Sequence, residues 1–334
     1  MKKNIKILVD GVGGDVGQGI VKSLLESDLN LEIFVADNKH SASWLYKINK
    51  SYVFPKVEED NFIKFLINFL NNNKIDIYFP SIDSAIMKLS KNKDLIENST
   101  NSKIFIDAYN KIKICNDKYL TQRFLLDFNF DAPKTCQVID KDEVESFFAD
   151  NEPPFILKPK IGNGSKDIHS ILSYEDLNNY FNNTEYILQE LLDIDYEITS
   201  GIYFGDDHEV KGIYVLRREL KDGSTYSAKR IIDENLNIKL IEIGKAMNMK
   251  YINIQAVYKN NTLIPFEFNG RMSGTTGAMR SVFNAPDFFI REKMLSEVIQ
   301  PSTDLHEISF SRYFEEVYYY PSDKKTLIER SKNE

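Results

Sequence analysis

Short apolar runs alternate with amphipathic stretches through the first third of the chain. Residues 5–9, 31–37 and 75–80 have the continuous apolar character of buried strands, and the second of these ends in an acid. Between them, residues 20–25 and 62–70 repeat apolar positions every three to four residues, which is typical of a helix that packs on a core. Strands and helices that alternate in this way predict a parallel, doubly wound sheet.

After about residue 110 the pattern changes, and helices separate runs of strand-like residues. The expected elements are helices at 117–128, 141–150 and 235–247 and strands at 155–158, 186–189, 197–204 and 209–216. Sheet and helix segregated in this manner favour an α+β arrangement. We therefore expect an α/β unit in residues 1–110, followed by two lobes in residues 111–190 and 191–334.

The later part of the chain also carries a cluster of polar side chains at strand spacing. Glu267, Asn269 and Arg271 stand at alternate positions, so on a strand they share one face. Residues 259–262 have the composition of a hairpin turn, which would bring Gln255 level with them. One carboxylate and two amide oxygens beside a cation suit a Mg²⁺ ion that also holds phosphates. The ordinary alternative is a pair of strands whose polar side chains face water, although β propensity disfavours such a face on a Phe-rich strand.

Composition excludes several other classes of protein. The 334 residues carry a formal net charge of −8, and the basic residues are scattered, which argues against a nucleic-acid partner. The two cysteines and four histidines do not form a metal-ligand or disulfide pattern. We expect neither a signal peptide nor a membrane partner, because no apolar run approaches the ~20 residues of a membrane span. The cytoplasm is the expected location.

A glycine-rich run follows the first strand. Residues 11–17 carry glycines at a spacing of three, and Asp37 ends the next strand, as in a dinucleotide-binding fingerprint. Residues 109–113 have the Tyr-x-x-x-Lys spacing that short-chain dehydrogenases use. An NAD(P)-dependent oxidoreductase is therefore one alternative. The other interpretation is structural: the glycines let the first helix pack closely on the sheet.

Lysines near a second glycine-rich segment are candidates for phosphate binding. Lys158 and Lys160 end a strand and precede the loop at residues 162–166, which includes Gly164 and Ser165. Backbone N–H groups of such a loop can surround phosphates, and a lysine can add charge. A hairpin turn with solvated lysines is an equally simple interpretation.

Two strand ends offer contacts for a nucleoside. Residues 190–192 end one strand and Glu197 begins the next. The backbone of such a connection can pair with a purine edge, and a carboxylate can accept bonds from two ribose hydroxyls. Either acid taken alone is more simply a surface residue at a strand end.

Taken in order, these features resemble the ATP-grasp superfamily over roughly residues 5–300. The most specific part is Gln255 followed by Glu267-Phe-Asn269-Gly-Arg271, where the family has a Gln and then Glu-x-Asn-Pro-Arg. The N-terminal glycine run resembles the pre-ATP-grasp domain, a Rossmann-like unit. The resemblance is closest to the synthetase domains of the carbamoyl phosphate synthetase large subunit and to single-unit relatives that join carboxylates to amines. Gly270 departs from the family's proline, and the chain has one synthetase unit and no glutaminase, which argues against carbamoyl phosphate synthesis.

The resemblance implies a two-lobed ATP-grasp fold and a set of site residues. The expected ATP contacts are Lys118, Lys158, Lys160, Gly164, Ser165, Glu190, Leu191, Leu192 and Glu197; the expected metal ligands are Gln255, Glu267 and Asn269; the expected catalytic residues are Arg271, which steadies the transferred phosphoryl group, and Arg218, which holds a substrate carboxylate.

The implied reaction is ATP-dependent and ADP-forming. A substrate carboxylate would become an acyl phosphate and then be joined to an amine, with two Mg²⁺ ions, or Mn²⁺, as cofactor. An amino acid or another small metabolite is the expected acceptor, and relatives are often homodimers. A non-catalytic protein that binds ATP is a further alternative.

Overall fold

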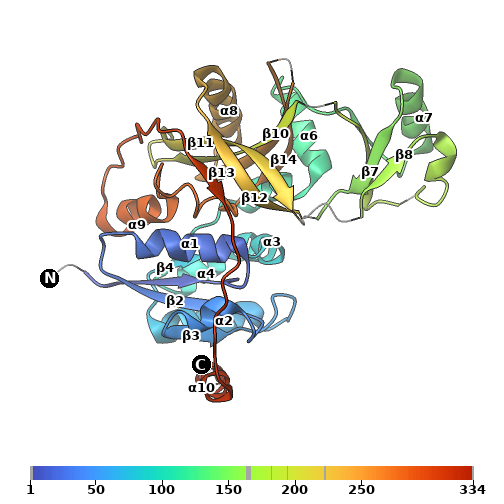
Figure 1. Ribbon diagram of the computed structural model, residues 1–334. Helices are drawn as coiled ribbons and strands as arrows, with labels where there is room; N and C mark the ends of the chain where they lie inside the picture. Colours follow the sequence, from blue (N-terminus) through green and yellow to red (C-terminus); the bar gives the residue numbers. More distant parts are fainter. Residues whose placement is uncertain are drawn as a thin grey trace.

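The computed structural model describes residues 3–162, 167–181, 183–193, 195–221, 223–259 and 261–332. Three separate sheets account for its strands, and they follow one another along the sequence (Figure 1). The first is parallel and the other two are built from antiparallel pairs. The predicted fold class, an α/β unit followed by α+β lobes, is confirmed.

The N-terminal unit is a five-stranded parallel sheet with the strand order β3-β2-β1-β4-β5. Its strands are β1 (Ile5–Val9), β2 (Leu31–Asp37), β3 (Lys50–Val53), β4 (Ile77–Phe79) and β5 (Lys103–Ile104), and its helices are α1 (Asp15–Leu25), α2 (Phe62–Asn73), α3 (Asp83–Lys91) and α4 (Lys93–Ser99). The helix expected at residues 20–25 begins earlier, at Asp15, so Gly17 and Gly19 are helical.

The second sheet has four strands in the order β6-β9-β7-β8. Its elements are β6 (Thr135–Gln137), α7 (Lys141–Asp150), β7 (Phe155–Pro159), β8 (His169–Ile171) and β9 (Tyr186–Glu190). Helices α5 (Tyr109–Asn116) and α6 (Lys118–Asp127) link the N-terminal unit to this lobe. The Asp117 side chain caps α6 by accepting from Tyr119 N and Leu120 N, which fixes the start of that helix.

The third sheet has six strands in the order β14-β13-β10-β11-β12-β15. Its elements are β10 (Tyr196–Phe204), β11 (Val210–Lys221), β12 (Ser224–Ile231), α8 (Glu234–Met247), β13 (Tyr251–Lys259), β14 (Thr262–Asn269), α9 (Ala285–Leu295) and β15 (Ser309–Ser311). In the β13–β14 hairpin, Gln255 lies opposite Glu267 and Asn253 lies opposite Asn269. The predicted hairpin and its register at Gln255 are confirmed.

The C-terminal segment returns to the N-terminal unit. After β15 the chain runs down the molecule to α10 (Pro321–Lys332), which packs against β3 (Figure 1). Leu327 is 3% exposed there, and the backbone N–H of Val53 donates to Ser331 Oγ at 2.7 Å. We call residues 304–320 the strap, because they join the six-stranded sheet to α10.

We propose that the three sheets correspond to the units expected at residues 1–110, 111–190 and 191–334, with α10 as an addition to the first. In the described part of the chain, no helix combines the length and the apolar character needed to cross a membrane.

Candidate functional site

A cleft of about 680 Å³ lies where the three units meet. Strands of both lobes and the first residues of α1 and α3 line it. The predicted site residues that line the cleft are Lys118, Lys158, Glu197, Arg218, Gln255, Glu267, Asn269 and Arg271. The fold therefore brings together residues that are up to 153 positions apart in the sequence, from Lys118 to Arg271.

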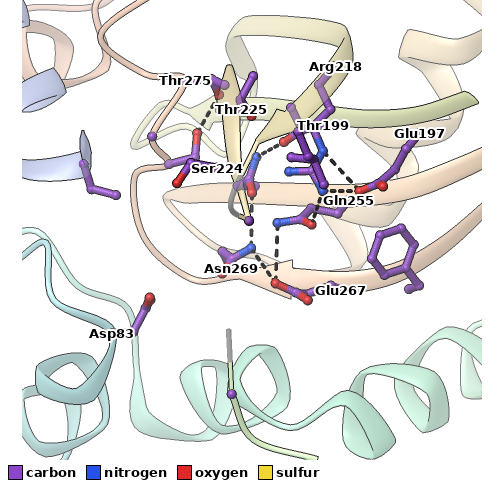
Figure 2. Close-up of a pocket in the computed structure, with 18 of the residues that line it drawn as sticks. Asp83, Glu197, Thr199, Arg218, Ser224, Thr225, Gln255, Glu267, Asn269 and Thr275 are labelled. Atoms are coloured by element: carbon purple, nitrogen blue, oxygen red, sulfur yellow. Dashed lines mark hydrogen bonds and ion pairs between the residues drawn. The ribbon is translucent and has the colours of Figure 1, made fainter. Parts of the chain in front are cut away.

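The Glu267 carboxylate is at the centre of the polar cluster on the β13–β14 hairpin (Figure 2). Gln255 Nε2 and Asn269 Nδ2 each donate to Glu267 Oε1 at 3.4 Å. Asn269 Nδ2 also contacts Asn253 Oδ1 at 3.2 Å. Hydrogen bonds of this length are weak, so the Glu267 and Asn269 side chains can reorient at little cost. Gln255 is held more firmly, because its Oε1 also accepts from Arg218 Nη2 at 2.6 Å.

This cluster fits a hard divalent cation. A carboxylate and two side-chain amides carry oxygen atoms that suit such an ion. A half turn of the Asn269 amide presents its oxygen in place of its nitrogen, whereas the Gln255 oxygen would have to exchange its bond with Arg218 for the cation. Mg²⁺ keeps water and substrate phosphates as its remaining ligands, so a protein site with one carboxylate is sufficient. Glu267, Gln255 and Asn269 are the residues that would hold it.

Two lysines lie next to the cluster. Lys118 Nζ is 4.0 Å from Glu267 Oε2 and donates to the carbonyl oxygen of Gly162 at 2.7 Å. Lys158 is 8% exposed and donates to Gln189 Oε1 at 2.7 Å. Burial, and to a smaller extent the positive charge of Lys118, lower the pKa of Lys158 to about 8. Both lysines can therefore bind a negatively charged ligand such as a phosphate group.

Arg218 and Glu197 form a partly buried ion pair on β11 and β10. Arg218 Nε donates to Glu197 Oε1 at 3.1 Å, and Nη2 donates to the same oxygen. Arg218 Nη2 also donates to Gln255 Oε1 at 2.6 Å. The arginine thus links the acid expected to face a ribose to one of the expected metal ligands, and all three lie on one wall of the cleft (Figure 2).

Arg271 lies beyond the end of β14 and reaches the N-terminal unit. Its Nη2 donates to Asp83 Oδ2 at 2.7 Å, and Nε donates to Asp83 Oδ1. Such a two-point pair between a guanidinium and a carboxylate is both strong and specific in direction. Asp83, the first residue of α3, therefore holds Arg271 at the boundary between the N-terminal unit and the large lobe.

Four expected ATP contacts do not line the cleft. Lys160 Nζ donates to Gln137 Oε1 at 2.6 Å, and Glu190 Oε1 accepts from the backbone of Lys134 at 2.7 Å. Leu191 is 51% exposed, and Leu192 is half-buried. Gly164 and Ser165 lie outside the described residues.

Several residues of the cleft were not identified from the sequence. They include Asp15, Asp83, Thr199, Asn253, Phe266 and Ser273. Asp15 lies inside the glycine run, and Asp83 begins the helix that follows β4. Both could have been proposed as site residues, because ligands bind beyond the carboxyl ends of parallel strands. No pattern in the sequence marked Phe266 as a cleft residue, because its place depends on a shift in strand register after Gln255.

The N-terminal glycines serve packing. A Cβ on Gly17 would lie 2.6 Å from the carbonyl oxygen of Gly11, and one on Gly277 would lie 2.4 Å from Gly19 Cα. The Asp37 carboxylate accepts from Gly13 N at 2.8 Å and from Lys39 N at 2.9 Å. These contacts favour the structural interpretation of the glycine run.

The space beside Asp37 is too small for a dinucleotide. The cavity at this edge of the parallel sheet encloses about 30 Å³, whereas ligand pockets usually enclose roughly 300–1,000 Å³. This observation argues against the NAD(P)-dependent alternative.

Two comparisons of the amino-acid sequence each match part of the chain. The family model of the PylC-like N-terminal domain matches residues 7–102. A carbamoyl-phosphate synthase from Methanobrevibacter smithii is 27% identical over 121 residues, which are 36% of this chain and 32% of that protein. The matched region thus spans about a third of the length of this curated relative.

Solved structures resemble the whole chain. The N5-carboxyaminoimidazole synthetase from Staphylococcus aureus, complexed with ADP, has a TM-score of 0.74 at 16% identity and covers 100% of this chain and 87% of that chain. The biotin carboxylase from Campylobacter jejuni has a TM-score of 0.67 at 12% identity and covers 88% of this chain and 71% of that chain. With these neighbours, the predicted ATP-grasp fold is confirmed.

Proposed function

We propose that this ATP-grasp protein is an ADP-forming ligase that activates a substrate carboxylate with ATP and joins it to an amine. The observation that carries the proposal is the grouping of Lys118, Lys158 and Glu267 with Arg271 around one cleft. Phosphoryl transfer requires mainly positioning and charge neutralisation, and this group supplies both.

Adenosine and phosphates would occupy the part of the cleft beside the β7–β9 pair. Phe266 lies under the Lys158 ammonium, with Nζ 5.7 Å from the ring centroid. Its ring offers a flat surface for a purine, while Lys158 and Lys118 face the phosphates. We keep Glu190–Leu192 as the expected contact with the purine edge and Glu197 as the expected contact with ribose. Lys160 and the loop residues Gly164 and Ser165 remain predicted phosphate contacts.

Glu267, Gln255 and Asn269 would hold two Mg²⁺ ions, or Mn²⁺, against the phosphates. Bound there, the cation neutralises charge on the phosphate oxygens. Arg218 limits the movement of Gln255 through its 2.6 Å hydrogen bond. The protein's own contribution is therefore to fix the ligand oxygens on the rigid β13–β14 hairpin.

The carboxylate and amine would bind at the end of the cleft that Arg271 and the N-terminal unit line. Hydroxyl groups of Ser273 and Thr275 and the acids Asp15 and Asp83 line that end of the cleft. Arg271 would neutralise the negative charge of the acyl phosphate, and Arg218 would neutralise that of the substrate carboxylate. The acids at this end of the cleft suit a positively charged or hydrogen-bonding amine. An amino acid or another small metabolite is the proposed acceptor, and the cytoplasm is the proposed location.

The test is a thermal-shift comparison of wild type and Glu267→Gln with MgATP and with NAD(P)H. A ligand at ~100 times its dissociation constant adds about 2.7 kcal/mol to the native state. For a chain of this size that corresponds to several degrees in Tm. We expect MgATP to raise the Tm of wild type, Glu267→Gln to lose most of that increase, and NAD(P)H to have no effect.

Glu242→Gln is the matched control, because Glu242 is an exposed acid on α8 outside the cleft. It should respond to MgATP as wild type does. An unchanged response in Glu267→Gln would contradict the metal assignment, and a response to NAD(P)H alone would contradict the ligase. ADP release with MgATP in a screen of carboxylate and amine pairs separates an enzyme from a protein that only binds ATP.

A further inference from the structure

A second cavity lies at the boundary between the N-terminal unit and the large lobe. It encloses about 270 Å³, close to the lower limit of roughly 300 Å³ for pockets that hold small ligands. Gly270 contributes to its wall, whereas the neighbouring Asn269 and Arg271 line the cleft. Among the described residues, the two spaces share none of their lining. We call this space the lysine cavity, because lysines dominate its charged lining.

The lysine cavity is basic, although the chain as a whole carries a net charge of −8. Its lining holds four lysines against two acids, and each unit supplies two of the lysines. The lysines are Lys93 on α4, Lys103 on β5, Lys250 directly before β13 and Lys293 on α9; the acids are Glu97 and Asp107. An excess of cations in a protein of opposite net charge favours a negatively charged ligand.

The two acids of the lining already hold backbone groups. Both carboxylate oxygens of Asp107 accept from Lys250 N, at 3.1 and 3.2 Å. Glu97 Oε1 accepts from Ile104 N at 3.0 Å. The lysines, and not the acids, are therefore the groups that can bind a ligand.

Two of the lysines have no carboxylate partner of their own. Lys93 Nζ donates to the carbonyl oxygen of Ile106 at 2.7 Å, and Lys103 is an exposed residue of β5. Neither lysine lies within ion-pair distance of a carboxylate in the part of the chain that the structure describes. A bound anion would therefore supply each of them with an ion-pair partner.

The other two lysines are paired with acids outside the lining. Lys250 pairs with the buried Glu292, and this pair is structural, because loss of either partner would leave a buried charge. Lys250 and Lys293 also contact Asp206, at 2.7 and 2.8 Å. The Asp206 side chain is 54% exposed, and an exposed pair contributes little to stability. Lys293 can therefore exchange Asp206 for a ligand at small cost.

Aromatic rings form the apolar part of the wall. Phe105, Tyr251 and Phe289 are 6%, 1% and 5% exposed. The Phe105 ring centroid lies 4.8 Å from that of Phe289, in an edge-on arrangement, and 6.3 Å from that of Tyr251. Phe105 directly follows β5, and ligands of parallel sheets bind beyond the carboxyl ends of the strands. The lining thus combines cations with a fixed apolar surface.

We propose that the lysine cavity binds a small phosphate monoester with an apolar or aromatic group, and that this ligand tightens the binding of MgATP in the cleft. Lys93, Lys103 and Lys293 would contact the phosphate, and the rings would contact the remainder of the molecule. Such a ligand would contact both units and Gly270, next to two residues of the cleft. The coupling, but not the binding itself, rests on the proposed function.

The binding is tested by isothermal titration calorimetry of the full chain with phenyl phosphate, which carries a phosphate group and an aromatic ring. We expect one site in wild type. Lys93→Gln/Lys103→Gln should raise the Kd at least about tenfold, since it removes two charge-assisted contacts. Lys158→Met, which removes a lysine of the cleft, should leave the Kd unchanged. Inorganic phosphate should bind more weakly than phenyl phosphate, because it lacks the ring.

Lys64→Gln/Lys239→Gln is the matched control, because it removes two positive charges from exposed positions on α2 and α8, outside the lysine cavity. It should bind phenyl phosphate as wild type does. Circular dichroism and Tm establish that each variant is folded, and Lys103→Gln alone replaces the cavity variant if that does not fold.

Three results would overturn the binding. They are the absence of binding to wild type, equal losses in the cavity variant and the matched control, and binding that is lost in Lys158→Met but kept in Lys93→Gln/Lys103→Gln. The last of these would place phenyl phosphate in the cleft.

The coupling is tested by the Kd for MgATP with and without saturating phenyl phosphate. We expect phenyl phosphate to lower that Kd about fivefold or more in wild type and to have no effect in Lys93→Gln/Lys103→Gln. An unchanged or higher Kd for MgATP in wild type would overturn the coupling. If phenyl phosphate binds but MgATP does not bind at all, the proposed function fails and the lysine cavity stands as a ligand site.

Discussion

Lys158 is the cleft lysine whose charge depends on pH near neutrality. Because the pKa of Lys158 is lowered to about 8, the ammonium is present below that pH and is lost above it. Phosphates favour the charged form, so MgATP binding at pH 8 should take up as much as about half a proton and should weaken as pH rises from 8 to 9.5. Calorimetry in two buffers of different ionisation enthalpy measures the uptake.

Lys158→Met provides the reference for that measurement, since it keeps the length of the side chain but cannot bind a proton. Its binding enthalpy should be independent of the buffer. Equal uptake in Lys158→Met and wild type would place the titrating group elsewhere.

The positions of site residues could be predicted from the sequence where the backbone is regular. Gln255 and Glu267 could be placed opposite each other because strand alternation and a short turn determine both. Phe266 could not be placed, because one register shift reverses the face of every residue beyond it. The Arg271–Asp83 pair spans 188 positions, and no local pattern encodes such a contact.

At the scale of the element, the start of α1 depends on close backbone packing. A Cβ on Gly17 would lie 2.6 Å from Gly11 O and 2.7 Å from Asp10 O, and neither backbone atom can move easily. Gly17→Ala should therefore lower the free energy of unfolding by about 1–3 kcal/mol, the usual cost of overpacking. A fall of several degrees in Tm would show it.

Gly14 is the matched comparison, because the nearest atom to an added Cβ is 3.5 Å away and the residue is the N-cap of α1. Gly14→Ser should leave the Tm unchanged or slightly higher, since serine is a favoured N-cap. A loss of stability equal to that of Gly17→Ala would mean that the run is constrained by its loop and not by packing.

Elements with a strong local signal were predicted closely. α7 and α8 follow the capping aspartates Asp140 and Asp233, and their apolar spacing marks the buried face. β15 and α10 were not predicted as a strand and a helix, because a three-residue strand and a helix with a single buried residue lack a periodic pattern. Their structure is set by the surfaces they pack on.

At the scale of the whole molecule, α10 closes the edge of the N-terminal sheet. Leu327 is the buried contact of α10, and truncating a buried leucine costs about 2–5 kcal/mol. Leu327→Ala should therefore lower the Tm and speed hydrogen exchange at residues 50–53 while leaving exchange at residues 251–259 unchanged. Ile238→Ala, at a half-exposed position on α8, should change stability by less than about 0.5 kcal/mol. If Leu327→Ala accelerated hydrogen exchange equally throughout the chain, a local role for α10 would be contradicted.

Because α10 packs on β3, the two elements of this contact are synthesised at very different times. β3 leaves the ribosome roughly 270 residues before α10, which at ~5–20 residues per second is about 15–55 seconds. Throughout that interval the edge of the first sheet is uncovered, although its core residues are already available to collapse. The edge therefore stays open to pairing with other chains until after the cleft-forming strands, the last of which ends at Asn269, have been synthesised.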